Sequence, residues 1–264
     1  MTKDWFDILE KEFDHPAVVL WRAVELRQLA QALADIPLKE PILDLGCAEG
    51  KIARLLLDGY RVIGLDNTWE LLHKSPRSAP YRGLTLGDAV SMPFRAERFG
   101  SVFSNCVIEH IPDLPAVLGE VGRVLAGGGY FIFTVPSASF GEYLSVSSLM
   151  KAIHCNAAAG WYARSRNASL NHFHCYDHDR WRQLLQERGF TLNYYKYYLG
   201  RRVTVLWDLL AIFWRFASCV FPSSLRQRLN KMLIKRLKSY YNISSSTGSG
   251  LLIVAQKEAT GGFP

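Results

Sequence analysis

The sequence predicts an α/β fold built on a doubly wound, mostly parallel sheet of seven strands, with a helical cap in front and a helical insert near the end. Short apolar stretches alternate with helical patterns between residues 41 and 136. Four consecutive strands of this region end in polar residues. With 264 residues, 49% of them hydrophobic, the chain can bury one large core. Strand–helix alternation places strands in parallel and helices on both faces.

The first 40 residues are expected to form an N-terminal helical cap. Apolar residues recur at helical spacing in residues 5–13 and again in residues 18–29, after Pro16. No uninterrupted apolar stretch follows a basic start, so we expect no secretory signal and a cytoplasmic location.

Residues 41–199 are expected to form the core. Its strands are predicted at 41–46, 61–66, 84–88, 101–105, 130–136 and 190–198, and its helices at 51–59, 68–75, 114–128 and 177–189. Residues 137–176, rich in Ser, Ala, Asn and His without a clean period, are interpreted as a partly helical lid. A helical insert, 200–246, separates this core from its last strand and tail, 247–264.

Charge and cysteine content exclude some classes of function. The net charge is +7, and residues 196–239 alone, with ten Lys or Arg and one acid, carry +9. A nucleic-acid partner is therefore not expected. The five cysteines form no CxxC pair, so we expect neither disulfides nor a zinc cluster; they are Cys47, Cys106, Cys155, Cys175 and Cys219.

The turn after the first strand, ILDLGCAEGK (42–51), has the character of a cofactor site. Gly46 and Gly50 let the backbone turn sharply and approach a ligand without a Cβ in the way. A dinucleotide-binding GxGxxG pattern would also need glycines where the chain has Ala48 and Lys51. Hydride-transfer cofactors are therefore disfavoured.

Acids follow the next two strands at matching depths. Asp66 ends the second strand, 22 residues after Asp44, where a carboxylate can accept both hydroxyl hydrogens of a ribose. Asp88 ends the third, where it could receive an adenine amino group. Each acid could instead cap the helix that follows, but the three together favour a ribose and adenine site.

These motifs carry a family resemblance. In order, they are LDLGCAEG, GLDNT, GDAVSMPF, FGSVFSNCVIEHIPDL and EVGRVLAGGGYFIFTVPS. They resemble the motifs of the class I S-adenosylmethionine-dependent methyltransferases, which have a Rossmann-like fold. More narrowly, they are similar to the type 11 domain of the ubiquinone and menaquinone biosynthesis methyltransferases. The resemblance is close over residues 40–136 and looser over 178–195.

The resemblance implies S-adenosylmethionine as cofactor and assigns its binding residues. The methionine part would lie against Asp44, Gly46, Cys47, Ala48 and Gly50, and the ribose against Asp66 and Asn67 at the end of the second strand. The adenine would lie against Asp88 and Ala89 at the end of the third strand, and the amino group beside Asn105 and Cys106 at the end of the fourth. Ala48 departs from the usual glycine, and its added methyl group narrows the turn but is tolerated if φ stays negative.

Histidines are the candidate catalytic residues. His110, in EHIPD, lies where a base could face the acceptor, or it could order the loop. In NHFHCYDHD (171–179), Asp177 should cap a helix, and His172, His174 or Tyr176 could line the acceptor side. The order HxHxxDH differs from the HxHxDH ligand run of metallo-hydrolases, so we expect no metal. The fourth strand also lacks the Asn-Pro-Pro-Tyr turn of enzymes that methylate amino groups of adenine or glutamine.

The late insert suggests a membrane surface. Residues 203–221 are long enough to span a bilayer, but Asp208 and Arg215 within them would each cost roughly 2.5 to 3.5 kcal/mol at its centre. The next segment is basic and amphipathic, with an apolar face of Leu225, Leu229, Met232, Leu233 and Leu237. This pair is typical of helices lying in the membrane interface. The alternative is packing on the protein's own domain or on a second subunit.

The sequence thus predicts a methyltransferase that uses S-adenosylmethionine and methylates a small, lipophilic acceptor at or near a membrane, peripherally through residues 203–238. A monomer or a homodimer is expected. Two alternatives stay open: a catalytically silent protein that keeps the fold for binding or scaffolding, and a soluble methyltransferase for a polar metabolite.

Overall fold

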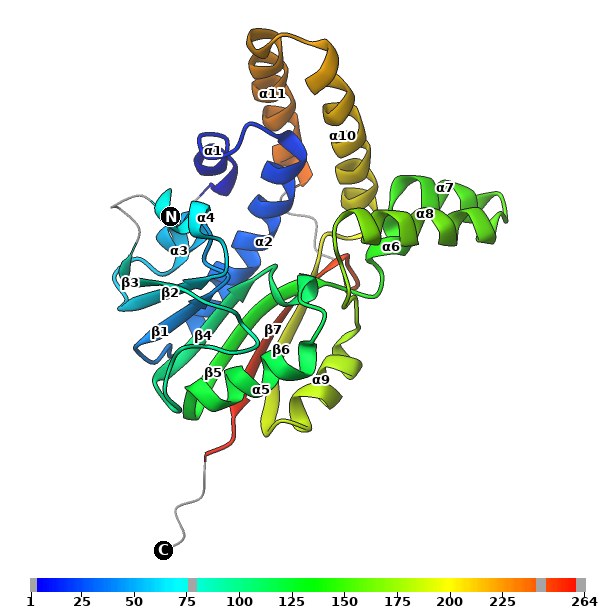
Figure 1. Cartoon of the computed structure of the whole chain (residues 1–264). Coiled ribbons are helices and arrows are strands. Elements are labelled where there is room, and N and C mark those ends of the chain that lie inside the picture. Colours follow the sequence, from blue (N-terminus) through cyan, green and yellow to red (C-terminus); the bar gives the residue numbers. More distant parts are fainter. Residues whose placement is uncertain (1–3, 76–79, 241–245, 260–264) are drawn as a thin grey trace, which may run out of the picture. The chain divides into compact units, whose positions relative to one another are not determined.

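The structure, a computed structural model, describes residues 4–75, 80–240 and 246–259 (Figure 1). The chain divides into two compact units. We call the first the helical unit, which comprises Met1–Gln31, Ser137–Leu170 and Tyr197–Gly250. We call the second the sheet unit, which comprises Ala32–Pro136, Asn171–Lys196 and Leu251–Pro264. Each unit is described by itself.

A seven-stranded sheet is the framework of the sheet unit. Its order is β3-β2-β1-β4-β5-β7-β6, and β1 pairs in parallel with both β2 and β4, β2 with β3, and β4 with β5. The order therefore reverses beside β1, between β2 and β4. This confirms the predicted fold class. The strands are β1 (Ile42–Leu45), β2 (Val62–Asp66), β3 (Tyr81–Leu86), β4 (Phe99–Asn105), β5 (Leu125–Pro136), β6 (Phe190–Tyr198) and β7 (Gly250–Lys257).

The last strand, β7, runs against its neighbours. The amide of Ser137, just after β5, donates to the carbonyl of Ser249, just before β7. The amide of Glu258, after β7, donates to Gly189, before β6. The end of β5 thus lies beside the start of β7, and the end of β7 lies beside the start of β6. Both pairs are therefore antiparallel.

Two helices cover one face of the sheet, α5 (Leu114–Val124) and α9 (His178–Gln186), and α3 (Lys51–Leu56) and α4 (Trp69–His73) lie on the other (Figure 1). The indole of Trp181 on α9 is fully buried and meets Phe133 of β5 edge-on, with ring centroids 5.1 Å apart. As predicted, the Asp177 carboxylate caps α9 by accepting from the Arg180 amide at 2.8 Å. This aromatic layer is part of the sheet unit's core.

The predicted helix at 114–128 is too long at its carboxyl end. The helix α5 ends at Val124, and β5 begins at Leu125, whose ψ of 133° is already extended. A side chain at Gly129 would place its Cβ 2.7 Å from the carbonyl oxygen of Gly100, so bare backbone is required where β5 approaches β4. The three glycines at 127–129 therefore belong to an irregular strand and not to a helix end.

The helical unit is built mainly from helices. In it α6, α7 and α8 contact one another, α10 contacts α6 and α7, and α10 and α11 follow each other as a helical hairpin (Figure 1). The last residues of α2, from Ala32, belong to the sheet unit. The helices are α1 (Trp5–Leu9), α2 (Pro16–Asp35), α6 (Phe140–Tyr143), α7 (Ser145–Ala152), α8 (Asn156–Ser169), α10 (Arg201–Val220) and α11 (Ser223–Leu237).

A buried charge anchors α10 inside the helical unit. The carboxylate of Asp208 is fully buried and accepts hydrogen bonds from the amide and hydroxyl of Ser145 at 3.0 and 2.6 Å and from the hydroxyl of Tyr162 at 3.0 Å. The guanidinium of Arg166 lies 3.2 Å from its other oxygen. One acid of α10 thereby connects this helix to α7 and α8.

Candidate active site

The turn between β1 and α3 is shaped by left-handed backbone. Gly46 and Gly50 have φ of 75° and 76°, as the predicted need for glycine implies. Ala48 has φ of 45°, so the condition of a negative φ for alanine is not met. The reason is local, because the amide of Ala48 donates to the Asp66 carboxylate at 2.9 Å and this bond holds the turn in its shape. An alanine in this region costs of order 1 kcal/mol.

The structure brings the predicted strand-end residues to one edge of the sheet. The amides of Gly46 and Cys47 donate to the carbonyl of Leu65 at the end of β2. A Cβ on Gly46 would lie 2.3 Å from Val107, which follows β4. The amide of Gly87, after β3, donates to the carbonyl of Asp66. The ends of β1 to β4 thus meet, beside the reversal in strand order where ligands of such sheets bind.

Asp66 holds the turn and its own loop together. One carboxylate oxygen accepts from Ala48 and the other from the amide of Thr68 at 2.9 Å. The side chain is half-buried, so each oxygen still offers a second lone pair to a ligand. Asn67 beside it is exposed, and its amide oxygen accepts from the Thr68 hydroxyl at 3.0 Å.

Asp44 lies beneath this edge, with 4% of its surface exposed. Its carboxylate accepts a 2.6 Å hydrogen bond from the hydroxyl of Tyr81. Burial, together with the negative charge of Asp66, raises the pKa of Asp44 to about 7, although the hydrogen bond from Tyr81 acts to lower it. Sequence reasoning missed Tyr81, because the predicted strand began at residue 84, and the phenol reaches Asp44 from the opposite end of β3.

The loop after β3 is fixed by a pair of charges on α5. Asp88 is exposed and accepts from the amide of Val90, while Met92 is buried. The guanidinium of Arg123 donates to the carbonyl oxygen of Met92 at 2.9 Å, and the carboxylate of Glu120 accepts from the Met92 amide at 2.6 Å. Glu120 and Arg123 also pair with each other. Their spacing on one helix face was a signal in the sequence, but nothing in it named the loop they hold.

After β4, Asn105 and Cys106 turn toward β5. The side-chain amide of Asn105 donates to the hydroxyl of Thr134 at 2.6 Å, and the amide of Cys106 donates to the carbonyl of Thr134 at 3.0 Å. Cys106 has φ of 53° and is half-buried. Thr134, which sequence reasoning missed, therefore sets the conformation of this part of the edge.

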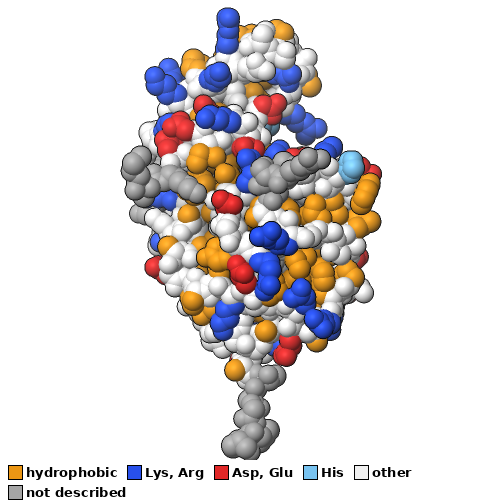
Figure 2. All heavy atoms as spheres, turned by 90° about the vertical axis from the view of Figure 1, so that its left-hand side faces the viewer, with side chains coloured by type: hydrophobic (Ala, Val, Ile, Leu, Met, Phe, Trp, Pro, Cys, Tyr) orange, Lys and Arg blue, Asp and Glu red, His pale blue; other side chains and the backbone are white. Residues whose placement is uncertain are grey.

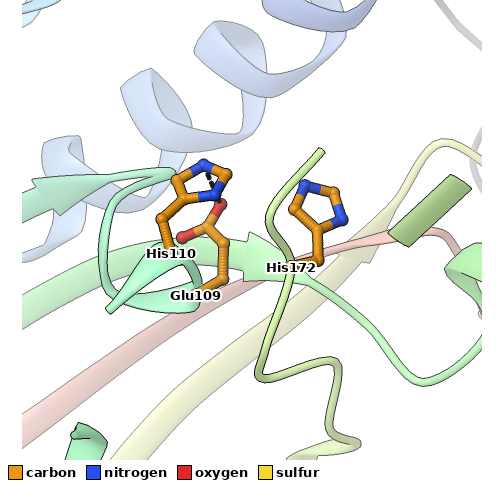
Figure 3. A group of neighbouring side chains, drawn as sticks. All are labelled: Glu109, His110 and His172. Atoms are coloured by element: carbon orange, nitrogen blue, oxygen red, sulfur yellow. Dashed lines mark ion pairs between the residues drawn. The ribbon is translucent and has the colours of Figure 1, made fainter. Parts of the chain in front are cut away.

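The three candidate histidines differ in their surroundings. His174 is buried, with Nε2 bonded to the carbonyl of Ile111 at 2.8 Å and Nδ1 to the hydroxyl of Tyr176 at 3.2 Å, so both ring nitrogens are engaged within the protein. His110 is exposed and lies beside half-buried His172, with ring centroids 5.3 Å apart (Figure 3). Of the three, His110 and His172 have the exposure needed to reach a ligand.

The strand order and the meeting of the ends of β1 to β4 are those of the Rossmann-like methyltransferase fold. Residues 43–133 match the family model described as a methyltransferase domain. The fold is similar to that of phosphoethanolamine N-methyltransferase 2 of Haemonchus contortus, which was solved in complex with S-adenosyl-L-methionine. The two structures superpose with a TM-score of 0.58 and 16% sequence identity over 89% of this chain and 52% of that one. At this identity the structural likeness shows the fold.

Two curated relatives match part of the chain. One is a malonyl-[acyl-carrier protein] O-methyltransferase of Hamiltonella defensa, 32% identical over 40% of this chain and 42% of its own length. The other is a demethylmenaquinone methyltransferase of Symbiobacterium thermophilum, 32% identical over 39% of this chain and 45% of its own length. The match thus spans less than half the length of these relatives. Residues 43–133 match a methyltransferase-domain model, and the relatives that match part of the chain are methyltransferases, which confirms the resemblance seen in the motifs.

Proposed function

We propose that this protein is an S-adenosylmethionine-dependent methyltransferase that methylates a small, lipophilic acceptor at a membrane surface. The observation that carries the catalytic part is the meeting of four strand ends at one edge, with a left-handed turn between Gly46 and Gly50 and acids from adjacent strands. The family match of residues 43–133 supports it.

The residues at this edge fit the cofactor. Gly46 and Gly50 leave bare backbone beside Asp66, and carboxylates suit a ligand that carries ribose hydroxyls and positive charge. In this proposal the turn holds the methionine part, Asp66 and Asn67 the ribose, and Asp88 with Ala89 the adenine. When bound, S-adenosylmethionine supplies an electrophilic methyl group on a sulfonium. The protein's task is then alignment, which can lower a barrier by about 7 to 11 kcal/mol.

The acceptor side contains His110 and His172, close to the end of β4. A base is needed only for an acceptor that must lose a proton. The relatives are named for different acceptors, an acyl-carrier-protein conjugate and a demethylmenaquinone, so the family match does not choose among acceptors.

The membrane part of the proposal rests on α10. This is the one helix in the described part of the chain that is long and apolar enough to cross a membrane. Its buried Asp208 has partners inside the helical unit, which disfavours a spanning role and favours a surface one. The exposed face of α10 carries an apolar stripe at helical spacing, more than 40% exposed throughout; its residues are Leu209, Ile212, Phe213, Phe216 and Val220.

The helix α11 contributes more exposed cations than exposed apolar side chains to the surface of this hairpin. Of the five residues of its predicted apolar face, Leu225 and Met232 are exposed, Leu229 and Leu233 are half-buried, and Leu237 is buried, so the protein itself covers part of this face. Exposed cations of the hairpin are Arg201, Arg202, Arg215, Arg228, Lys231, Lys235 and Arg236. Figure 2 shows Lys and Arg side chains at the top of the view. Apolar side chains beside cations suit an anionic lipid surface.

Vesicle flotation tests the membrane part. The protein should float with vesicles of phosphatidylcholine and phosphatidylserine, and more weakly with phosphatidylcholine alone. The double substitution Phe213→Glu and Phe216→Glu should reduce binding at least about tenfold, since charge replaces exposed apolar surface. Leu84→Glu, at a residue of similar exposure on β3, is the matched control and should bind as the unchanged protein does.

Absence of binding to both kinds of vesicle would overturn the membrane part and favour a soluble methyltransferase with a polar acceptor. Equal loss in the Leu84→Glu control would also contradict it, because the effect would then not depend on the α10 stripe.

A further inference from the structure

A second chemical grouping lies at the end of β4, outside the predicted cofactor residues. Glu109 and His110 come from the short helix after β4 (Ile108–His110), and His172 comes from the extended segment before α9 (Figure 3). One carboxylate oxygen and one nitrogen of each imidazole all lie within 4.8 Å of one another. Residues more than 60 positions apart in the sequence thus present three possible metal ligands together.

A backbone hydrogen bond holds the two segments in place. The amide of Phe173 donates to the carbonyl of Glu109 at 2.8 Å, so the residue after His172 is bonded directly to a member of the group. His174 adds a second attachment through its bond to the carbonyl of Ile111. Because both attachments flank the group, the position of His172 beside Glu109 is set by the fold.

The hydrogen bonding of His110 prepares one nitrogen for a metal. Its Nδ1 lies 3.1 Å from the backbone carbonyl oxygen of Asn171, which can only accept, so Nδ1 carries the proton. In the neutral ring Nε2 then has a free lone pair, and this atom lies 3.8 Å from the carboxylate of Glu109. Metal-binding histidines typically donate from their other nitrogen in this way.

The three residues range from buried to exposed, so that one side of the group is open to solvent. Glu109 is 1% exposed, His172 is half-buried and His110 is exposed. A buried carboxylate gives the group a negative charge, and the exposed side leaves room for further ligands. Two imidazoles and one carboxylate with open positions suit divalent transition ions such as Zn²⁺ or Fe²⁺.

We propose that Glu109, His110 and His172 bind one divalent transition-metal ion, with open coordination positions toward solvent. Metal–nitrogen distances of about 2.0 to 2.1 Å require ligand atoms roughly 3.4 Å apart, so small rotations of the side chains complete the site. This proposal departs from the expectation of no metal, which was based on the cysteine spacing and on the run at 171–179. The signal missed was the Glu-His pair at 109–110, which the fold places beside His172.

The use of the ion rests on the proposed function. An oxygen of the acceptor that coordinates the ion would be held beside the end of β4, and its pKa would fall, so that its proton leaves to solvent more readily. Metal binding itself does not depend on this use and is tested separately.

The test is a titration of the chelator-treated full chain with Zn²⁺, followed by calorimetry, and with Co²⁺, followed by visible absorption. One equivalent should bind, and bound Co²⁺ should show the visible absorption bands of a low coordination number. His110→Asn and His172→Asn should each weaken binding at least about a hundredfold, because loss of a ligand costs more than the roughly 10- to 100-fold loss caused by removing an outer hydrogen-bond partner. His178→Asn, in a half-buried histidine outside the group, should bind as the unchanged protein does.

Binding that is unchanged in both His110→Asn and His172→Asn, or the absence of a stoichiometric site, would overturn the proposal. Thermal unfolding of each variant verifies that the fold persists. Binding of S-adenosylhomocysteine, measured in the same preparations, separates the two proposals. A protein that binds Zn²⁺ but not S-adenosylhomocysteine contradicts the methyltransferase proposal alone. A protein that binds S-adenosylhomocysteine but not Zn²⁺ contradicts the metal site alone.

Discussion

At the scale of single residues, the turn after β1 shows how one side chain shapes a site. Ala48 holds a left-handed φ of 45° because its amide is bonded to Asp66, and the neighbouring glycines adopt the same region without a Cβ. The site therefore contains a small conformational strain at the residue that departs from the family's usual glycine.

Replacing Ala48 by glycine should relieve that strain. We expect Ala48→Gly to raise the free energy of unfolding by up to about 1 kcal/mol, because the left-handed conformation costs glycine little. Urea denaturation measures the change. Ala53→Gly, inside α3, is the control and should destabilise by about 1 kcal/mol. Destabilisation by Ala48→Gly would mean that the alanine methyl group packs favourably and that strain is not the dominant effect.

At the scale of elements, Asp208 decides how α10 is held. Four groups from α7 and α8 interact with this carboxylate, and the helix presents its apolar stripe on its exposed face. A helix of this length and composition could be taken for a membrane span from its sequence alone. The polar network explains why the charge is tolerated.

Removing the negative charge of Asp208 should destabilise the helical unit. We expect Asp208→Asn to lower the free energy of unfolding by about 3 to 5 kcal/mol, since the partly buried guanidinium of Arg166 loses its counter-charge. Asp179→Asn, in an exposed pair with Arg182, should change it by less than about 1 kcal/mol. Denaturation followed by circular dichroism compares the two. Equal, small effects would show that the Asp208 network contributes little.

The elements that the sequence predicted well are those whose pattern is local. The strands at β1, β2 and β4 and the cap of α9 by Asp177 follow from apolar runs and one capping residue. The end of α5 did not, because the close approach of Gly129 to Gly100 is a contact between strands. Tyr81 beside Asp44 and the group of Glu109 with His172 were missed for the same reason, since each joins segments distant in the sequence.

At the scale of the whole molecule, two compact units have different roles in the proposed account. The sheet unit carries the strand-end residues and the His110–His172 pair, and the helical unit carries the apolar stripe and the cations of α10 and α11. The cofactor claim can therefore be tested apart from the membrane claim, by substitutions confined to the sheet unit.

The most direct measurement is calorimetric titration of the full chain with S-adenosylhomocysteine. The account predicts one site per chain, with affinity reduced at least about tenfold by Asp66→Ala, since hydrogen bonds to a charged group contribute about 1.5 to 3 kcal/mol each. Asp58→Ala, at an exposed acid just after α3, should leave the affinity unchanged. Absence of binding to well-folded protein, or equal affinity in Asp66→Ala, would contradict the account.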